Sequence, residues 1–190
     1  LPAFPGIFEF SLMRGGTSEK DKKLARLFDD LFQEMSDMVQ ANYDNVVPAM
    51  KALPAIDRVI PVEAQIEACQ EEVLPADEVK KIIDKFDTIA VATCYCRHEK
   101  DLLDDPCKVT DQRENCLVLG PGAQFTIDKN FARPITKDEA RQILKESENA
   151  GLVHKSFHAK LDPEKEQEAI CSCCKCCCGT FQLYYRGVRA

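Results

Sequence analysis

Cysteine is the residue that most constrains what this chain can fold into. Ten of its eleven cysteines fall in two groups, one from Cys94 to Cys116 and one from Cys171 to Cys178. Disulfide scaffolds of this density belong to small secreted proteins, and we expect no secretion signal here. Adjacent cysteines also pair poorly, because a bridge between neighbours is strained. We therefore predict thiolates that bind metal.

The density of thiolates predicts a soft or borderline metal. Structural zinc usually takes two CxxC pairs that close one tetrahedral site, whereas CxC and CC pairs predominate here. A 4Fe-4S cluster takes four thiolates, usually from a compact run plus remote cysteines, which fits this sequence better. We expect one or two 4Fe-4S clusters, with zinc as the alternative or as a substitute in aerobic preparations. The predicted ligands are Cys94, Cys96, Cys107, Cys116, Cys171, Cys173, Cys174, Cys176, Cys177 and Cys178.

The division of these thiolates between sites stays open at the level of sequence. If the run from Cys171 to Cys178 is extended, alternate residues face opposite sides and two sites can share the run. If the run coils, CxxC pairs such as Cys171 with Cys174 converge instead. The two arrangements predict different ligand sets.

Two residues beside the first cysteine pair are candidate cofactor-binding residues. Arg97 and His98 follow Cys96 directly. Donors and charges near cluster sulfurs tune the reduction potential, and solvation at the surface is the alternative role for both side chains. The remaining cysteine, Cys69, stands alone and is expected to be a small buried residue rather than a ligand.

Hydrophobic periodicity predicts an α+β fold, with a small mixed sheet, packed helices and a long cluster-ordered loop. The loop is expected at residues 97–133. A structureless stretch of that length is unusual in a compact domain unless something else orders it, and a metal cluster could do so. A turn is expected at 119–123, and a loop or short helix at 155–168. The expected strands are 7–12, 58–62, 88–92 and 152–154, and the expected helices are 18–43, 74–86 and 136–150.

Two parts of the chain are expected from this pattern. Residues 1–56 hold a strand and a long amphipathic helix packed on the rest, and residues 57–190 form a cysteine-rich iron–sulfur cluster domain. No apolar run approaches the roughly 20 residues that span a bilayer, so we expect a cytoplasmic protein without a membrane partner. The net charge of −7 also argues against nucleic acid, whose partners usually present a basic face.

The order of motifs along the chain resembles a known family. The motifs are Phe-Pro-Gly-Ile-Phe-Glu-Phe, Arg-Val-Ile-Pro-Val, Cys-x-Cys-Arg, Asp-x-x-x-x-Cys-Leu-Val-Leu-Gly, Pro-Ile-Thr-x-x-Glu-Ala, Ala-Gly-Leu-Val-His and Cys-x-Cys-Cys-x-Cys-Cys-Cys-Gly. Over nearly its whole length the chain is similar to 4Fe-4S binding, or ferredoxin-family, proteins of anaerobes. Such proteins generally carry a winged-helix segment before this region and a bacterial ferredoxin module after it. We expect the present sequence to be their cysteine-rich middle region, without those modules.

The resemblance implies electron transfer in anaerobic metabolism, with ligands at the ten clustered cysteines. We therefore expect an iron–sulfur electron-transfer domain of a larger redox protein, with a redox partner protein or a ferredoxin module as its partner. Catalysis is expected to belong to the partner rather than to this chain. The alternatives are a structural zinc-binding domain and an iron–sulfur redox-sensing regulator.

Overall fold

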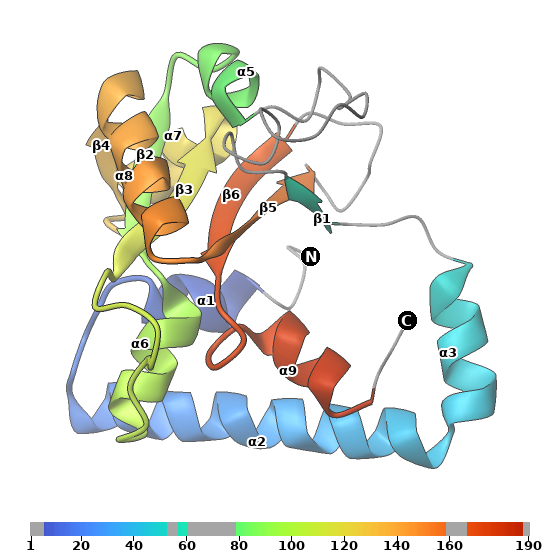
Figure 1. The fold of residues 1–190 in the computed structure, drawn as a ribbon. Helices are drawn as coiled ribbons and strands as arrows, with labels where there is room; N and C mark the ends of the chain where they lie inside the picture. Colours follow the sequence, from blue (N-terminus) through green and yellow to red (C-terminus); the bar gives the residue numbers. More distant parts are fainter. Residues whose placement is uncertain (1–5, 53–56, 61–78, 159–166, 188–190) are drawn as a thin grey trace. The chain divides into compact units, whose positions relative to one another are not determined.

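A computed structural model describes residues 6–52, 57–60, 79–158 and 167–187 of the chain (Figure 1). Its contacts divide the chain into two compact units. The helical unit comprises Leu1–Pro54, Tyr95–Asp111 and Cys174–Ala190, and the sheet unit comprises Ala55–Cys94 and Gln112–Cys173. The first division lies close to the predicted boundary between residues 56 and 57, but two later segments return to the helical unit. Each group of cysteines is therefore shared between the two units.

The sheet unit is built on six strands, and every pairing among its described strands is antiparallel. The order across the sheet is β1-β5-β6-β3-β2-β4, so β1 and β4 are the outermost of these strands. Together with the helices, this sheet confirms the α+β class. The strands are β1 (Asp57–Ile60), β2 (Ile89–Thr93), β3 (Glu114–Leu119), β4 (Arg133–Ile135), β5 (Val153–His158) and β6 (Gln167–Cys173).

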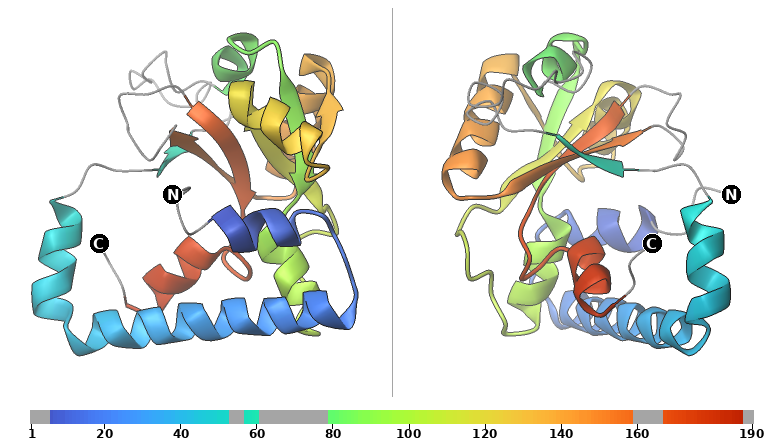
Figure 2. Two further views of the ribbon diagram at one scale, coloured as in Figure 1. Left: turned by 180° about the vertical axis from the view of Figure 1, so that it is seen from behind. Right: turned by 45° about the vertical axis from the view of Figure 1, so that its right-hand side comes forward.

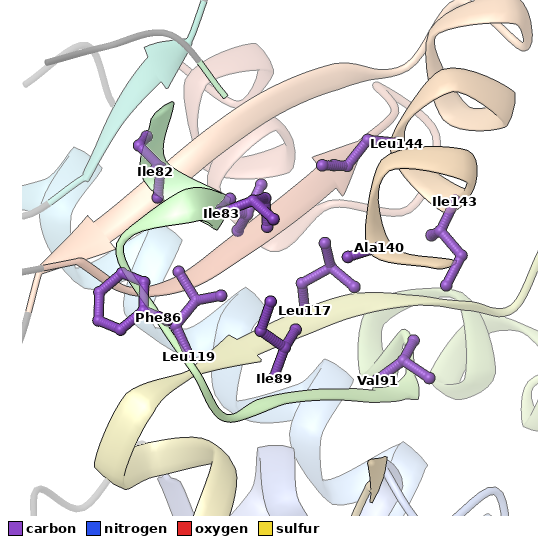
Figure 3. Close-up of a cluster of buried hydrophobic side chains, with 11 residues drawn as sticks. Ile82, Ile83, Phe86, Ile89, Val91, Leu117, Leu119, Ala140, Ile143 and Leu144 are labelled. Atoms are coloured by element: carbon purple, nitrogen blue, oxygen red, sulfur yellow. The ribbon is translucent and has the colours of Figure 1, made fainter. Parts of the chain in front are cut away.

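One face of this sheet carries the main hydrophobic core (Figure 3). Alternation along the strands places Leu117 and Ile170 on this face, and helices α5 (Val79–Asp84) and α8 (Lys137–Asn149) cover it. Full burial of each large apolar side chain contributes about 1.5–3 kcal/mol. The core consists of Ile82, Ile83, Phe86, Ile89, Val91, Leu117, Leu119, Ala140, Ile143, Leu144 and Ile170.

Helix α8 follows the signals in its sequence. The Thr136 side chain caps the helix by accepting a hydrogen bond of 3.1 Å from the Glu139 backbone N–H. Gly151, with φ of +76°, adopts the left-handed conformation that commonly ends a helix. The predicted helix at 136–150 is confirmed.

The opposite face of the sheet is covered by α7 (Gly120–Asp128), as Figure 2 shows. A Cβ atom on Gly122 would lie 3.3 Å from Cγ1 of Val118, so the absence of a side chain lets α7 lie close to β3. The predicted turn at 119–123 is therefore wrong. Pro121 lies in the first helical turn, where its missing N–H needs no partner.

The predicted long loop at 97–133 is also wrong. Helix α6 (Tyr95–Leu102), β3 and α7 occupy most of it. The apolar run Leu117-Val118-Leu119 pairs in the middle of the sheet, where both faces are covered, so it lacks the alternation of a half-buried strand. Tertiary pairing orders β3 within this segment.

The N-terminal strand predicted at 7–12 is a helix, α1 (Gly6–Leu12). Six residues are too few to distinguish the hydrophobic period of a helix from that of a strand. Leu12 packs against Ala25, Phe28 and Leu102 in the core of the helical unit, and this packing favours the helix. In the same unit, α2 (Glu19–Ala41) confirms the long helix, which begins at a capping box between Ser18 and Asp21.

The remaining helices are α3 (Tyr43–Lys51) and α9 (Gly179–Tyr185), both in the helical unit. In the sheet unit, β5 runs on to His158 and β6 begins at Gln167, so most of the described part of the predicted loop at 155–168 is strand. The rest of that loop, residues 61–62, residues 74–78 and Cys69 lie outside the described residues. Among the described helices, none is long and apolar enough to span a bilayer.

Candidate metal centre

Four cysteines of the helical unit come together in one group. The sulfurs of Cys107, Cys174, Cys176 and Cys177 all lie within 4.8 Å of one another. Cys107 Sγ is 3.7 Å from the sulfurs of Cys174 and Cys176, and Cys176 Sγ is 3.5 Å from Cys174 Sγ and 3.6 Å from Cys177 Sγ. No disulfide joins any of the ten cysteines that the structure describes. We call this group the first centre.

Cys107 is positioned by the end of helix α6. Asp104 adopts a left-handed conformation with φ of +60°, and the Asp105 N–H bonds to the Lys100 carbonyl, which is the pattern of a Schellman cap. Pro106 follows and prevents further helix. The chain therefore leaves α6 at a fixed place, with Cys107 two residues beyond the cap.

The other three ligands lie in a tight turn before helix α9. The Cys178 N–H bonds to the Cys174 carbonyl at 3.1 Å, and the Gln182 side chain donates to the Lys175 carbonyl at 2.7 Å. Gly179 allows α9 to approach α2, because a Cβ atom there would lie 2.6 Å from the Phe32 ring. These contacts hold the turn while its thiols face Cys107.

The thiols of the first centre share their protons unequally. The pKa of Cys174 is lowered to about 4, chiefly because the Cys177 thiol donates to it and also because of the charge of Arg97. The pKa of Cys177 is raised, since its proton is held by Cys174 and its sulfur is buried. A metal ion displaces such protons when it binds. The arrangement is thus a preformed set of soft donors.

A backbone donor also points at this group. The Lys108 N–H donates to the Cys176 sulfur and lowers its pKa, although burial raises that pKa by more. Hydrogen bonds to ligating sulfurs are among the interactions that set the potential of a metal centre. Sequence reasoning missed this donor, because every residue other than proline has a backbone N–H.

The other predicted ligands are not members of the first centre. Cys96 is buried on α6, and Cys178 Sγ lies 3.1 Å from the Thr180 hydroxyl. The four remaining predicted ligands belong to the sheet unit and are Cys94, Cys116, Cys171 and Cys173. The run from Cys171 to Cys178 is therefore neither wholly extended nor wholly coiled. Its first three residues belong to β6, and the rest form the turn.

The two predicted cofactor-binding residues differ in their surroundings. Arg97 is 1% exposed, and its charge acts on Cys174 within the helical unit. His98 lies with its Nε2 atom 2.8 Å from the Gly16 carbonyl oxygen, an interaction that joins α6 to the loop before α2. The structure thus gives Arg97 an electrostatic link to the first centre and gives His98 a structural contact.

Chemically, the first centre can hold a metal ion. Four sulfurs around one zinc ion, at a Zn–S distance of about 2.3 Å, stand about 3.8 Å apart in a tetrahedron. Four of the six sulfur separations are 3.5–3.7 Å, close to that value, and the other two are within 4.8 Å. Comparisons with protein-family models, with curated proteins and with solved structures find no match for this chain. The metal site therefore rests on its own geometry.

Removal of the Arg97 charge is expected to weaken metal binding at the first centre. In an Arg97→Met variant the pKa of Cys174 should rise, so that more free energy is needed to form its thiolate. We expect metal affinity to fall about 10–100-fold, as for other groups next to a ligand. Competition with a chromophoric chelator measures this. Arg97→Lys keeps the charge and is the matched control, and equal affinities in the two variants would contradict the prediction.

Glu99 gives a pH-dependent prediction for the helical unit. Burial raises the pKa of its carboxyl from 4.5 to about 7, although the nearby Lys100 lowers it. The folded state thus holds this proton more tightly, so Glu99 contributes stability below about pH 4.5 that is lost as the pH rises through about 7. Glu99→Gln should remove up to about 3 kcal/mol of this pH dependence.

Urea unfolding of the wild type and of Glu99→Gln, at about pH 5.5 and at about pH 8, tests this prediction. The variant should gain stability relative to the wild type at the higher pH. Glu34→Gln, on the exposed side of α2, is the control and should show no such gain. A constant difference between the Glu99 variant and the wild type would show that Glu99 ionises normally in the fold.

Proposed function

We propose that the chain is an iron–sulfur electron-transfer domain of a larger anaerobic redox protein. The observation that carries this proposal is the gathering of four thiols from distant parts of the sequence, Cys107 and Cys174 to Cys177, beside the buried Arg97. Thiolate ligands are those that iron–sulfur clusters use. A buried cation offsets part of the negative charge of such a centre.

Access to the first centre also suits electron transfer. Cys174 and Cys177 are buried, whereas Cys107 and Cys176 are partly exposed. One side of a bound cluster would thus lie near the surface, where a redox partner protein or a ferredoxin module can approach. Neither Cys107 nor Cys176 belongs to a helix or strand. The four sulfurs can therefore move apart to accommodate a cluster without the loss of helix or sheet hydrogen bonds.

A structural zinc ion is the second candidate, and the sulfur spacing favours it. Four of the six sulfur separations are 3.5–3.7 Å, which suits one tetrahedral ion. The four thiolates of a cubane bind four different irons and stand farther apart. Zinc would hold the loop after α6 to the turn before α9 and would transfer no electrons.

Anaerobic reconstitution distinguishes the two candidates. Reduced protein is offered ferrous iron with sulfide, zinc alone, or both, and its metal and acid-labile sulfide are then measured. If the proposal is right, the protein takes up iron and sulfide in the presence of zinc, and its visible absorption bleaches with dithionite. Mössbauer spectroscopy then gives the cluster type. A colourless protein that binds zinc and no sulfide would overturn the iron–sulfur proposal and support zinc.

A further inference from the structure

A second set of four cysteines lies within the sheet unit. Cys94 follows β2, Cys116 belongs to β3, and Cys171 and Cys173 belong to β6. These strands are neighbours in the sheet, in the order β6-β3-β2. The fold thus brings cysteines that span nearly eighty positions of the sequence to adjacent strands. The first centre, by contrast, consists of residues of the helical unit.

Strand register places three of these thiols on one face. Leu117 pairs with Ile170, so the next antiparallel step sets Cys116 beside Cys171. Both point away from the core face that carries Leu117, and Cys173 shares the direction of Cys171 because it lies two residues further along β6. The Cys171 thiol is hydrogen-bonded to those of Cys116 and Cys173.

The fourth thiol is carried to the same end of the sheet by β2. Ala92 pairs with Cys116, and a register shift follows between Ala92 and Thr93. The Cys94 N–H donates to the Arg113 carbonyl at 2.7 Å, which fixes its backbone beside the start of β3. Cys94 also acts electrostatically on Cys171. Cys94 therefore directly follows the last paired residue of β2, at the end of the strand where Ala92 pairs with Cys116.

A buried cation lies next to this set. Lys155 on β5 pairs with Cys171 on β6, so the two side chains share a face of the sheet. Lys155 is 6% exposed, and its Nζ atom lies 5.6 Å from the centre of the Phe157 ring. Four thiolates around a divalent ion leave a net negative charge, which is costly to bury without a counter-charge. Lys155 can supply it.

From this geometry we propose that Cys94, Cys116, Cys171 and Cys173 form a second thiolate metal centre, with Lys155 as its counter-charge. The proposal that there are two centres holds whichever metal they bind. Only the kind of metal rests on the proposed function. Two sets of four thiols account for eight of the ten clustered cysteines. Cys96 and Cys178 are left as non-ligands.

The kind of metal at the second centre follows from the proposed function. A 4Fe-4S cluster takes four thiolates, and the second set supplies that number. The second centre is therefore assigned a 4Fe-4S cluster, and the experiments below test zinc as well.

Differential alkylation of the unaltered protein is the first test, because it needs no variant that folds. Protein reconstituted anaerobically with ferrous iron and sulfide, or with zinc, is treated with iodoacetamide and digested for mass spectrometry. Ligating thiols are protected by metal and become reactive after chelation. We expect protection at Cys94, Cys116, Cys171 and Cys173 as well as at the first centre, and none beyond burial at Cys96. Protection of the first centre alone would overturn the proposal.

Paired variants give the second test. Cys171→Ser should lower bound metal by about half and expose the remaining cysteines of the second set, while those of the first centre stay protected. Cys107→Ser should give the reverse pattern. An unchanged metal content in Cys171→Ser, in protein whose circular dichroism matches the wild type, would remove the second centre. Two zinc ions without sulfide would leave the second centre standing and overturn the iron–sulfur function.

The role of Lys155 is tested separately. Lys155→Met should lower the reduction potential of the second centre, because a positive charge beside the cluster stabilises the more negative, reduced state. Lys155→Arg keeps the charge and should retain the potential. Equal potentials in the wild type and in Lys155→Met would show that this lysine is not the counter-charge, although the four ligands would stand.

Discussion

Serine in place of Cys174 should empty the first centre, whereas serine in place of Cys178 should leave it filled. Cys174 Sγ lies 3.5 Å from Cys176 Sγ and 3.7 Å from Cys107 Sγ, and it has the lowered pKa of a ready thiolate. Cys178 is four residues away and also buried, but its thiol lies against Thr180. Cys174 and Cys178 are thus similarly buried and close in the sequence, and they differ in whether the sulfur belongs to the first centre.

The effect of Cys174→Ser should exceed the roughly 10–100-fold loss of affinity expected when a residue next to a ligand is removed. Metal content after anaerobic reconstitution and chelator competition both measure it. Cys178→Ser should retain the affinity of the wild type. If the two variants lose metal equally, the list of ten ligands predicted from the sequence describes the protein better than the group of four.

Truncation of Leu117 to alanine should strongly destabilise the sheet unit. Leu117 is fully buried at the centre of the core, between β2 and β6 and beneath α5 and α8. Loss of a buried leucine side chain costs about 2–5 kcal/mol, because a cavity remains. Leu27→Ala is the control, since this leucine is 52% exposed and its loss should change stability by no more than about 0.5 kcal/mol.

Hydrogen exchange followed by mass spectrometry can localise this effect. Peptides from β2, β3 and β6 should exchange faster in Leu117→Ala than in the wild type under native conditions. The four tyrosines lie at positions 43, 95, 184 and 185, all in the helical unit, so tyrosine fluorescence during urea unfolding follows that unit separately. Unchanged exchange in the sheet would show that Leu117 contributes little to its stability.

The sequence patterns gave wrong secondary structure in a short segment and in a strand at the centre of the sheet. The run at 7–12 alternates like a strand, yet Leu12 is buried in a helical core. Strand β3 lacks alternation because it is covered on both faces, and without it the stretch from 97 to 133 resembles a loop. Lys155 falls in the predicted loop or short helix at 155–168, although Val153 and Phe157 on either side of it continue a strand period that predicts a shared face.

Soft-donor chemistry could be predicted from the sequence alone, because ten clustered cysteines with few plausible disulfide pairings favour metal binding. The sequence also determined the long helix α2 and the capped helix α8, whose periodicity and end signals are local. Which thiols share a site was decided by the tertiary structure alone. Cys107 and Cys174 are 67 positions apart and meet at the first centre, while Cys173 and Cys174 are neighbours assigned to different units. Strand register and the cap of α6 fix these partnerships, and both depend on residues distant in sequence.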